Sequence, residues 1–518
     1  MYVTDAVHSH SGKSHYLAVS MVRWLEIAHL MRRPLRILVV AFTNTAVNKL
    51  IGDLNTRVKL WAERRAETVA ASSASNPYRA PASIKVCRLS AHASDTEKAN
   101  LAGVEFISHS DCNKFFGAMR SRDGEQSLLV VGSTVWQLEK LKPAVLFDAL
   151  VIDEGSQLPL IDSAIALQRL KPDADRVIVA GDHLQLPPII QASYPLPEDP
   201  HHAALYGSVL HGLMRDELGL RIDAPHLDTE RAAKGVLTVK LTENRRSNRT
   251  LSNFTQRLYG KDYEVAVGGK PKRLLVRHAP EPGSIWERAV LDDSLASIVT
   301  VHIDLLKPTY SIATDHQLAI EADLVSRVVK ELVASCAPFE WLEKKRTNCF
   351  SCFVVTPHRN QRAAVNRQLR PFFAEIAQRG LESQLKIMVD TVERTQGQEA
   401  DAVIVSLGIL DADRLDEELD FIYNLQRLNV AFSRAIRSCI LVASKAVLMP
   451  DVGVLASVER SRAYSHLLSF VADSNVELSC TYSGDFDDRQ PLPPQVSTVR
   501  STATSTTTSG STHAADSE

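Results

Sequence analysis

The sequence predicts an α/β protein built from two domains, each containing a parallel sheet. Short apolar runs alternate with helical patterns along most of the chain, which is the signature of strands joined by crossover helices. The runs show no polar alternation, so the strands are expected to be buried on both faces, as in parallel sheets. The chain has 518 residues and is too long for one ordinary core.

The first domain is predicted over residues 1–240. Leu17, Met21 and Leu25 recur at helical spacing, which predicts a helix over His15–Leu30. A surface excursion rich in Ala and Ser is expected over 62–83, inside a larger insertion around 55–127. The expected strands are Leu35–Ala41, Ile84–Leu89, Leu128–Val131, Ala149–Ile152 and Val177–Ala180.

The second domain is predicted over residues 241–485. A Pro-rich excursion over Gln191–His202 precedes it, and residues 486–518 form a tail that is rich in Pro and then in Ser and Thr. The tail has too few apolar groups to offset the entropy of ordering, so it is expected to be disordered. The expected strands of this domain are Val299–Ile303, Phe353–Val355, Ile387–Val389, Val403–Leu407 and Ile440–Ala443.

Composition excludes some classes of protein but does not identify a function. No apolar run approaches the roughly 20 residues that cross a bilayer, so no membrane span is expected. The N-terminus lacks a secretory signal, and the seven cysteines are scattered, so an intracellular protein, nuclear or cytoplasmic, is expected. Cys349 and Cys352 are interpreted as buried thiols rather than metal ligands. A net charge of −2 neither supports nor excludes nucleic-acid binding.

Gly12-Lys13-Ser14 is a candidate phosphate site because it opens the first predicted helix. Phosphate binding uses backbone N–H groups at a helix N-terminus, a lysine for the β- and γ-phosphates and a hydroxyl for Mg²⁺. These three residues supply the second half of the usual loop pattern. The first half departs from it, since Val7 and His10 stand where such loops carry glycine.

Two further segments follow predicted strands. Asp153 and Glu154 come directly after an apolar strand, where carboxylates can hold Mg²⁺ and orient an attacking water. The alternative is a strand end with helix-capping acids. Gln185 lies in Gly181–Pro188, where two prolines fix a loop from which its amide can sense a γ-phosphate. A plain structural turn is the alternative for that segment.

The order of these motifs resembles a known family. Asp153–Gln157 and Gly181–Pro188 resemble motifs II and III of the superfamily 1 helicases. The residues of both motifs are similar to those of the 5′-to-3′ branch of this superfamily, which includes the up-frameshift helicase of nonsense-mediated decay and the nuclease-helicase of Okazaki-fragment processing. Six other segments of the chain resemble the remaining motifs of the family and follow the family's order. They are Ala41–Leu50, Val130–Val135, Leu241–Phe254, Val354–Gln361, Val389–Ser406 and Gln426–Val442.

The resemblance implies two RecA-like P-loop NTPase domains that bind ATP and Mg²⁺. Arginine suits a γ-phosphate because its planar fork stays charged and binds oxygens in pairs, although an isolated arginine is more often a surface or salt-bridge residue. The catalytic residues that the family resemblance implies are Glu154, Gln185, Arg246 and Arg434. The nucleotide-binding residues are Gly12, Lys13, Ser14, Arg427 and Glu399, with Ser14 and Asp153 as ligands of the metal.

The resemblance also implies a track for single-stranded DNA or RNA along the strand ends of both domains. Hydroxyl, amide and guanidinium donors can bind phosphates there without reading bases, so little sequence specificity is expected. Turn capping by Ser, Thr and Asn is the alternative for about half of them. The residues are Thr43, Asn44, Ser133, Thr134, Thr356, Pro357, Arg359, Thr391 and Gln396.

Three departures from the family pattern keep alternative functions open. The first departure is the phosphate loop described above. The second is that the chain begins close to that loop, so the family's upstream adenine-reading segment is missing and an N-terminally truncated chain is expected. Arg245 also stands where the family often has an aromatic residue. The leading hypothesis is an ATP-driven 5′-to-3′ helicase or translocase. The alternatives are a catalytically weakened scaffold that binds nucleic acid or protein, through accessory loops and tail, and an ATPase that remodels complexes without unwinding.

Overall fold

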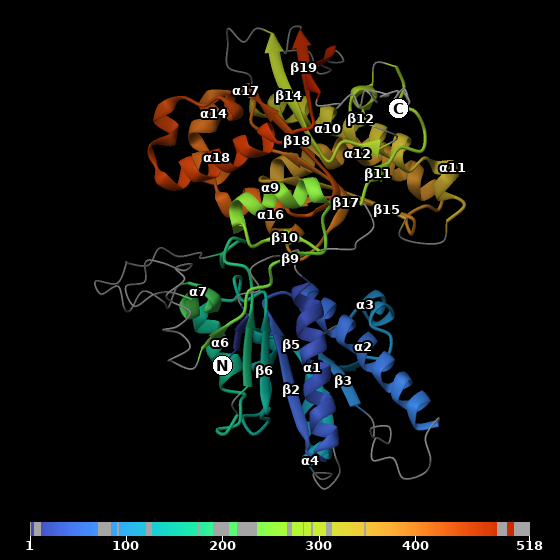
Figure 1. Cartoon of the computed structure of the whole chain (residues 1–518), viewed down its shortest axis with the longest axis vertical. Helices are drawn as coiled ribbons and strands as arrows, with labels where there is room; N and C mark the ends of the chain where they lie inside the picture. The colour runs from blue at the N-terminus through green and yellow to red at the C-terminus, as the bar shows by residue number, and fades with distance from the viewer. Residues whose placement is uncertain are drawn as a thin grey trace, which may run out of the picture. The chain divides into compact units, whose positions relative to one another are not determined.

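The computed structural model divides into two compact units, shown in Figure 1. Unit 1 comprises Met1–Arg246 and Thr255–Gly269, and unit 2 comprises Ser247–Phe254 and Lys270–Glu518, so the chain passes between them more than once. The structure describes residues 2–4, 12–70, 84–90, 93–120, 127–174, 176–189, 207–214, 236–266, 272–282, 284–291, 294–306, 313–345, 349–483 and 495–501.

The sheet of unit 1 is parallel throughout, with strand order β4-β3-β5-β2-β6-β7-β1-β8. The strand β7 therefore lies between β6 and β1. The strands are β1 (Tyr2–Thr4), β2 (Leu35–Ala41), β3 (Ile84–Leu89), β4 (Glu105–Ile107), β5 (Leu128–Thr134), β6 (Ala149–Asp153), β7 (Arg176–Ala180) and β8 (Leu237–Thr238).

Helices cover both faces of this sheet because its central strands are apolar on both sides. In β2, Ile37 and Val39 pack in the core with α1 and α2, whereas Leu38 and Val40 pack in the opposite core with α4 to α7. The helices are α1 (Lys13–Leu30), α2 (Asn44–Ala70), α3 (Asp95–Asn100), α4 (His109–Arg120), α5 (Val135–Leu138), α6 (Leu160–Leu167) and α7 (Val209–Met214).

The sheet of unit 2 has the order β16-β15-β17-β18-β14-β19-β20 and is parallel except for its last strand. The strands are β14 (Ile298–Leu306), β15 (Phe350–Thr356), β16 (Leu385–Thr391), β17 (Ala400–Ser406), β18 (Ala435–Ser444), β19 (Val476–Ser483) and β20 (Gln495–Ser501). Short strands form two small sheets: β9 (Glu243–Asn244) with β10 (Glu264–Val265), and β11 (Leu274–Leu275), β13 (Ser294–Leu295) and β12 (Val290–Leu291).

Aromatic packing ties α9 to the helices of unit 2. Phe254 stacks on His466 with ring centroids 4.7 Å apart and meets Phe432 and Phe470 edge-on. The helices are α9 (Arg249–Tyr259), α10 (Thr314–Cys336), α11 (Phe339–Leu342), α12 (Arg359–Gln378), α13 (Val392–Thr395), α14 (Ala412–Glu417), α15 (Leu419–Ile422), α16 (Leu425–Phe432), α17 (Lys445–Leu448) and α18 (Val458–Ala472), with 3₁₀ helices η2 (Ile285–Arg288) and η3 (Val452–Ala456). None of the helices in the described parts of the chain is long and apolar enough to cross a membrane.

The predicted fold class is confirmed: two α/β domains with parallel sheets, and every predicted strand falls on an observed one. The surface excursion over 62–83 is wrong for its first part, because α2 continues to Ala70. Arg65 holds that end of α2 against α1 through an ion pair of 2.6 Å with Glu26. The larger insertion around 55–127 contains the predicted strand Ile84–Leu89, observed as β3, and it also contributes β4 to the sheet.

The disordered tail is also wrong in part, because β20 pairs antiparallel with β19. Without β20 the strand β19 would lie at the edge of the sheet, and its backbone offers a ladder of hydrogen bonds to β20. Val496 also packs against the core, which the low apolar content of the tail did not suggest. Residues 486–494 and 502–518, the excursion Gln191–His202 and the loop positions Val7 and His10 lie outside the described residues.

Candidate nucleotide site and nucleic-acid edge

The carboxyl ends of neighbouring strands meet at one edge of the unit 1 sheet. Ala41 at the end of β2 is in register with Thr134 of β5 and with Asp153 of β6. At the end of β7, Ala180 is in register with Thr4 of β1. The carboxyl ends of β6, β7 and β1 therefore lie side by side, at the edge where open α/β sheets bind their ligands.

The helix α1 begins at this edge with a glycine in the left-handed conformation. Gly12 has φ 78° and ψ 30°, and it accepts the first helical hydrogen bond from Tyr16 N at 2.8 Å. A residue with a Cβ would be strained there, which explains the glycine. The next two residues, Lys13 and Ser14, form the first turn, where backbone N–H groups favour anions.

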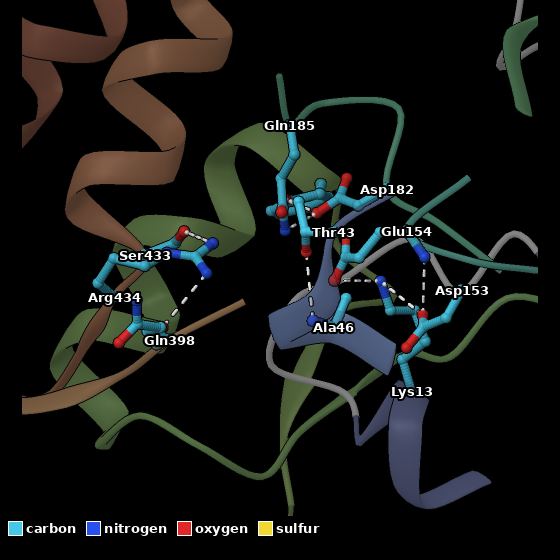
Figure 2. A network of polar contacts seen from close by, with 11 residues as sticks. Lys13, Thr43, Ala46, Asp153, Glu154, Asp182, Gln185, Gln398, Ser433 and Arg434 are labelled. Atoms are coloured by element: carbon cyan, nitrogen blue, oxygen red, sulfur yellow. Dashed lines mark hydrogen bonds and ion pairs between the residues drawn. The ribbon is translucent and has the colours of Figure 1, made fainter. Parts of the chain in front are cut away.

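Lys13 lies between Asp153, the last residue of β6, and Glu154, which follows it (Figure 2). Its Nζ is 2.9 Å from Glu154 Oε1 and 3.4 Å from Asp153 Oδ1. All three side chains are buried, and the two carboxylates outweigh the cost of desolvating the ammonium, so the pKa of Lys13 is raised. Burial raises the pKa of Asp153. The sequence-predicted lysine and acids thus form one buried charge cluster.

The backbone at Glu154 is held in an unusual conformation. Glu154 has φ +53°, the left-handed region that non-glycine residues rarely adopt, and its N–H donates to Asp153 Oδ1 at 2.9 Å. Gly155 N donates to Ala180 O at 2.8 Å, and a Cβ on Gly155 would lie 2.7 Å from Val179 Cγ1. The turn after β6 is therefore pinned against the end of β7, as expected where strain is kept for function.

The loop after β7 is organised around a buried aspartate (Figure 2). Asp182 Oδ2 accepts a hydrogen bond from Gln185 Nε2 at 2.7 Å. It also accepts one from Tyr259 Oη at 2.8 Å, and burial raises the pKa of Asp182 to about 6. Gln185 is thus fixed through its amide nitrogen. Sequence reasoning gave Asp182 and Tyr259 no role, because no pattern links Tyr259 to a loop 77 positions earlier.

Arg246 and Arg245 differ in exposure although they are adjacent. The N–H of Arg246 donates to Asn244 Oδ1 at 3.0 Å, and its side chain is half-buried. Arg245 is exposed, and its guanidinium is 2.6 Å from Glu243 Oε2. If Arg245 were to stack on a base in place of the family's aromatic residue, this ion pair would have to open.

In unit 2, Arg434 is held by oxygen atoms of its own surroundings (Figure 2). Its Nε donates to Val430 O at 2.9 Å, and its terminal nitrogens donate to Ser433 Oγ at 3.0 Å and Gln398 O at 3.3 Å. The guanidinium is fully buried. Its orientation is therefore set by the turn that joins α16 to β18.

Comparison with known proteins identifies the family. Two family profiles, both described as "AAA domain", match residues 118–193 and 229–446. The chain is 26% identical over 335 residues to "DNA replication ATP-dependent helicase/nuclease dna2" of Schizosaccharomyces pombe (strain 972), covering 63% of this chain and 20% of that protein. It is 24% identical over 306 residues to "Uncharacterized ATP-dependent helicase MJ0104" of Methanocaldococcus jannaschii, covering 59% of this chain and 37% of that one.

The chain belongs to the superfamily 1 helicases. It spans about a fifth and about a third of the lengths of these two curated relatives. Similar solved structures include an Arterivirus nonstructural protein 10 helicase with DNA (13% identity, TM-score 0.34, 88% of this chain and 62% of that one) and Mss116p bound to ssRNA and AMP-PNP (10%, 0.43, 94% and 72%).

Arg427 of this superfamily 1 helicase connects three of the matched motifs. Its guanidinium lies 3.8 Å from the ring centre of Phe421, and its Nε is 3.2 Å from Glu393 Oε1. His358 stacks on Phe421 with ring centroids 4.7 Å apart. These contacts give Arg427 a positioning role in unit 2, whereas its contact with nucleotide stays a prediction. Glu399, also predicted to bind nucleotide, is exposed.

The residues predicted to bind nucleic acid fall into two groups. Some cap their own turns: Thr43 Oγ1 accepts from Ala46 N at 3.2 Å, Ser133 Oγ donates to Thr134 O at 2.9 Å and Thr356 Oγ1 donates to His358 O at 2.9 Å. The exposed side chains are those of Thr43, Asn44 and Arg359; Gln396 is half-buried, and Ser133, Thr134, Thr356, Pro357 and Thr391 are buried.

A buried glutamate that the sequence did not indicate lies under the end of β17. Glu321 Oε1 accepts from Ser406 Oγ at 2.6 Å and from Gly408 N at 2.8 Å. Its Oε2 is buried and has no hydrogen-bond partner within the described residues. Burial raises the pKa of Glu321 to about 7. Gln361 in α12 donates to the same Ser406 hydroxyl at 2.9 Å, so Glu321 fixes the loop that follows β17.

Glu321→Gln is expected to change how stability depends on pH. Because the folded-state pKa lies above the ordinary value, Glu321 contributes stability below pH 4.5 that is lost as the pH rises through 7, about 3 kcal/mol in total. The neutral variant lacks this loss, so its free energy of unfolding should gain on wild type between pH 5 and 8. Urea unfolding of wild type and variant at pH 5 and at pH 8 measures this difference in the free energy of unfolding. Glu382→Gln, at an exposed site, is the control. A difference between variant and wild type that is independent of pH would contradict the assignment.

Proposed function

We propose that this superfamily 1 helicase hydrolyses ATP to move along single-stranded nucleic acid in the 5′-to-3′ direction. The buried cluster of Lys13 with Asp153 and Glu154 carries the proposal, because it joins a phosphate-binding cation to two carboxylates at a helix N-terminus. The "ATP-dependent helicase" wording of both curated relatives supports it.

The residues at this edge suit a nucleotide and Mg²⁺. The Ser14 hydroxyl and the Asp153 carboxylate are the hard oxygen ligands that Mg²⁺ prefers, and the carboxylates now paired with Lys13 carry more negative charge than that lysine balances. A bound Mg²⁺ would supply positive charge that offsets the negative charge developing on the phosphate oxygens. The N–H groups at the start of α1 and the Lys13 ammonium would hold the phosphates.

Glu154 would position the water that attacks the γ-phosphate. The attack is in line with the departing β-phosphate oxygen: a bond forms from the water oxygen to phosphorus, the bond to the bridging oxygen breaks, and a proton passes from the water toward the Glu154 carboxylate. Gln185, which is held in place by Asp182, would sense the γ-phosphate through its side-chain amide. Arg246 and Arg434 would offset the charge of the transition state.

The strand would bind along the carboxyl edges of the sheets, where the nine predicted residues lie. The exposed Thr43, Asn44 and Arg359 supply hydroxyl, amide and guanidinium donors that suit phosphate oxygens of either DNA or RNA. Binding of this kind follows the backbone and is expected to be weak in sequence preference.

The test is ATP turnover by the purified chain with no polymer, with poly(U) and with oligo(dT). Turnover that rises several-fold with either polymer supports the motor, and the better polymer separates RNA from DNA. A folded protein that binds single strands but shows no turnover would contradict the motor and favour the scaffold, whose basis is the departure at Val7 and His10. Strand displacement on a duplex with a 5′ or a 3′ overhang then tests the direction.

A further inference from the structure

An exposed tryptophan lies at the carboxyl edge of the unit 1 sheet, where β2 and β5 end. Trp136 is 54% exposed, although it sits on the four-residue helix α5 directly after β5. Its neighbours Val135 and Leu138 are fully buried and anchor the helix on the core. Because β5 and β2 end in register, α5 begins beside the segment that carries Thr43 and Asn44. A large aromatic side chain is therefore kept in solvent on a rigid support.

The support comes from Arg88 of β3, which is 1% exposed. Its guanidinium donates to three side-chain amides: Asn44 Oδ1 at 2.6 Å, Asn48 Oδ1 at 2.8 Å and Gln137 Oε1 at 3.0 Å. It also donates to the carbonyl oxygens of Leu89 and Gly132. One side chain thus joins the start of α2 to α5, and the residue next to Trp136 is one of its partners.

This arrangement orients donors and leaves a positive charge beneath the edge. Arginine can only donate, so the amide oxygens of Asn44 and Gln137 must face it and their amide nitrogens are directed away, available as donors to phosphate oxygens. Every described hydrogen-bond acceptor of Arg88 is neutral, and the nearby carboxylate of Glu97 is bound to Asn48 Nδ2 at 3.1 Å and not to the guanidinium itself. Both features favour an anionic ligand that also offers a flat apolar surface.

We propose that Trp136 stacks on a base of the bound single strand, and that Arg88 is a positioning residue that holds Trp136 and Asn44 in place. The proposal rests on the proposed function. A nucleic-acid strand fits the chemistry because each nucleotide pairs a phosphate, which suits the amides of Asn44 and Gln137, with a base, which suits the indole. Stacking on any base keeps the contact independent of sequence.

The first test measures binding of fluorescent oligo(dT) and oligo(U) to the full chain by anisotropy. Trp136→Ala should weaken binding roughly 5- to 100-fold, the range that stacking of one base contributes, and Trp136→Phe should restore part of it. The slope of log affinity against log salt should stay unchanged, because no phosphate contact is lost. Ile161→Ala, at a 63% exposed position on α6, is the matched control and should bind as wild type.

The second test removes the bases. On an abasic oligonucleotide, wild type and Trp136→Ala should bind equally, and 2-aminopurine placed along the strand should be quenched at one position by wild type only. Gln137→Ala, which keeps the indole but removes one hold of Arg88, should weaken binding and reduce the further effect of Trp136→Ala. Thermal unfolding of each variant shows that it is folded.

The outcomes separate this inference from the proposed function. Wild type that binds no single strand overturns both. Wild type that binds, with Trp136→Ala equal to it on every strand, overturns the stacking position alone and leaves the exposed indole to a protein partner. A steeper loss on abasic than on intact strands would also contradict stacking.

Discussion

Lys13→Met is expected to abolish ATP turnover and to lower the free energy of unfolding by about 3 kcal/mol. The variant keeps the length of the side chain but leaves two buried, adjacent carboxylates without the cation that now lies within 3.4 Å of both. Removing one partner of a buried ion pair costs more than the pair contributes, because the remaining charge stays desolvated. Urea unfolding and ATP turnover measure the two effects.

The pH dependence of the loss of stability in Lys13→Met gives a second check of the buried cluster. Without Lys13, which now favours the charged form of Asp153, the pKa of Asp153 should rise further, so the folded variant binds a proton more tightly and its stability falls as the pH rises. The deficit should be larger at pH 8 than at pH 5. Lys171→Met is the control, since Lys171 pairs with Asp148 in a partly exposed position and should cost at most about 1 kcal/mol. Equal losses in the two variants would contradict the buried cluster.

Gly181→Ala is expected to lower turnover at least tenfold and stability by about 2 kcal/mol. The added Cβ would lie 2.9 Å from the backbone nitrogen of Ser156 and 2.8 Å from Leu210 Cδ2, so backbone must move. Movement there separates the loop that carries Asp182 and Gln185 from the turn at Glu154, and the catalytic groups lose their alignment.

The matched control for this variant is Gly117→Ala in α4 of the same unit. A Cβ on Gly117 meets no atom within 4 Å, so the substitution should stabilise the helix by about 0.5 kcal/mol and leave turnover unchanged. Steady-state turnover and urea unfolding of both variants decide the matter. Wild-type turnover in Gly181→Ala would mean that the two loops need not stay in contact.

Much of the fold could be predicted because its strands are apolar on both faces. Leu35–Ala41 matches β2 residue for residue, since a run that is almost wholly apolar is stable as a strand buried on both faces. Ile84–Leu89 also matches β3 residue for residue, although Lys85 and Arg88 interrupt its apolar residues. The meeting of Lys13 with Asp153 and Glu154 was also predictable, because parallel strands bring their following loops to one edge.

Contacts between distant segments were not predictable from the sequence. Arg88 binds amides 40 to 49 positions away, and Tyr259 reaches Asp182 across 77 positions. No local pattern marks such pairs, since a buried arginine and an exposed one look alike in a sequence. β20 was missed for a related reason: its strand forms through the backbone of β19 and not through its own apolar content.

The most direct test of the account compares ATP turnover by wild type and Glu154→Gln in the presence of the better polymer. Glutamine keeps the size of the side chain but cannot accept a proton, so turnover should fall at least a hundredfold while ATP affinity is kept, because Lys13 and the α1 N-terminus are unchanged. Strand-stimulated turnover in Glu154→Gln close to that of wild type would contradict the assignment of this edge as the site of hydrolysis.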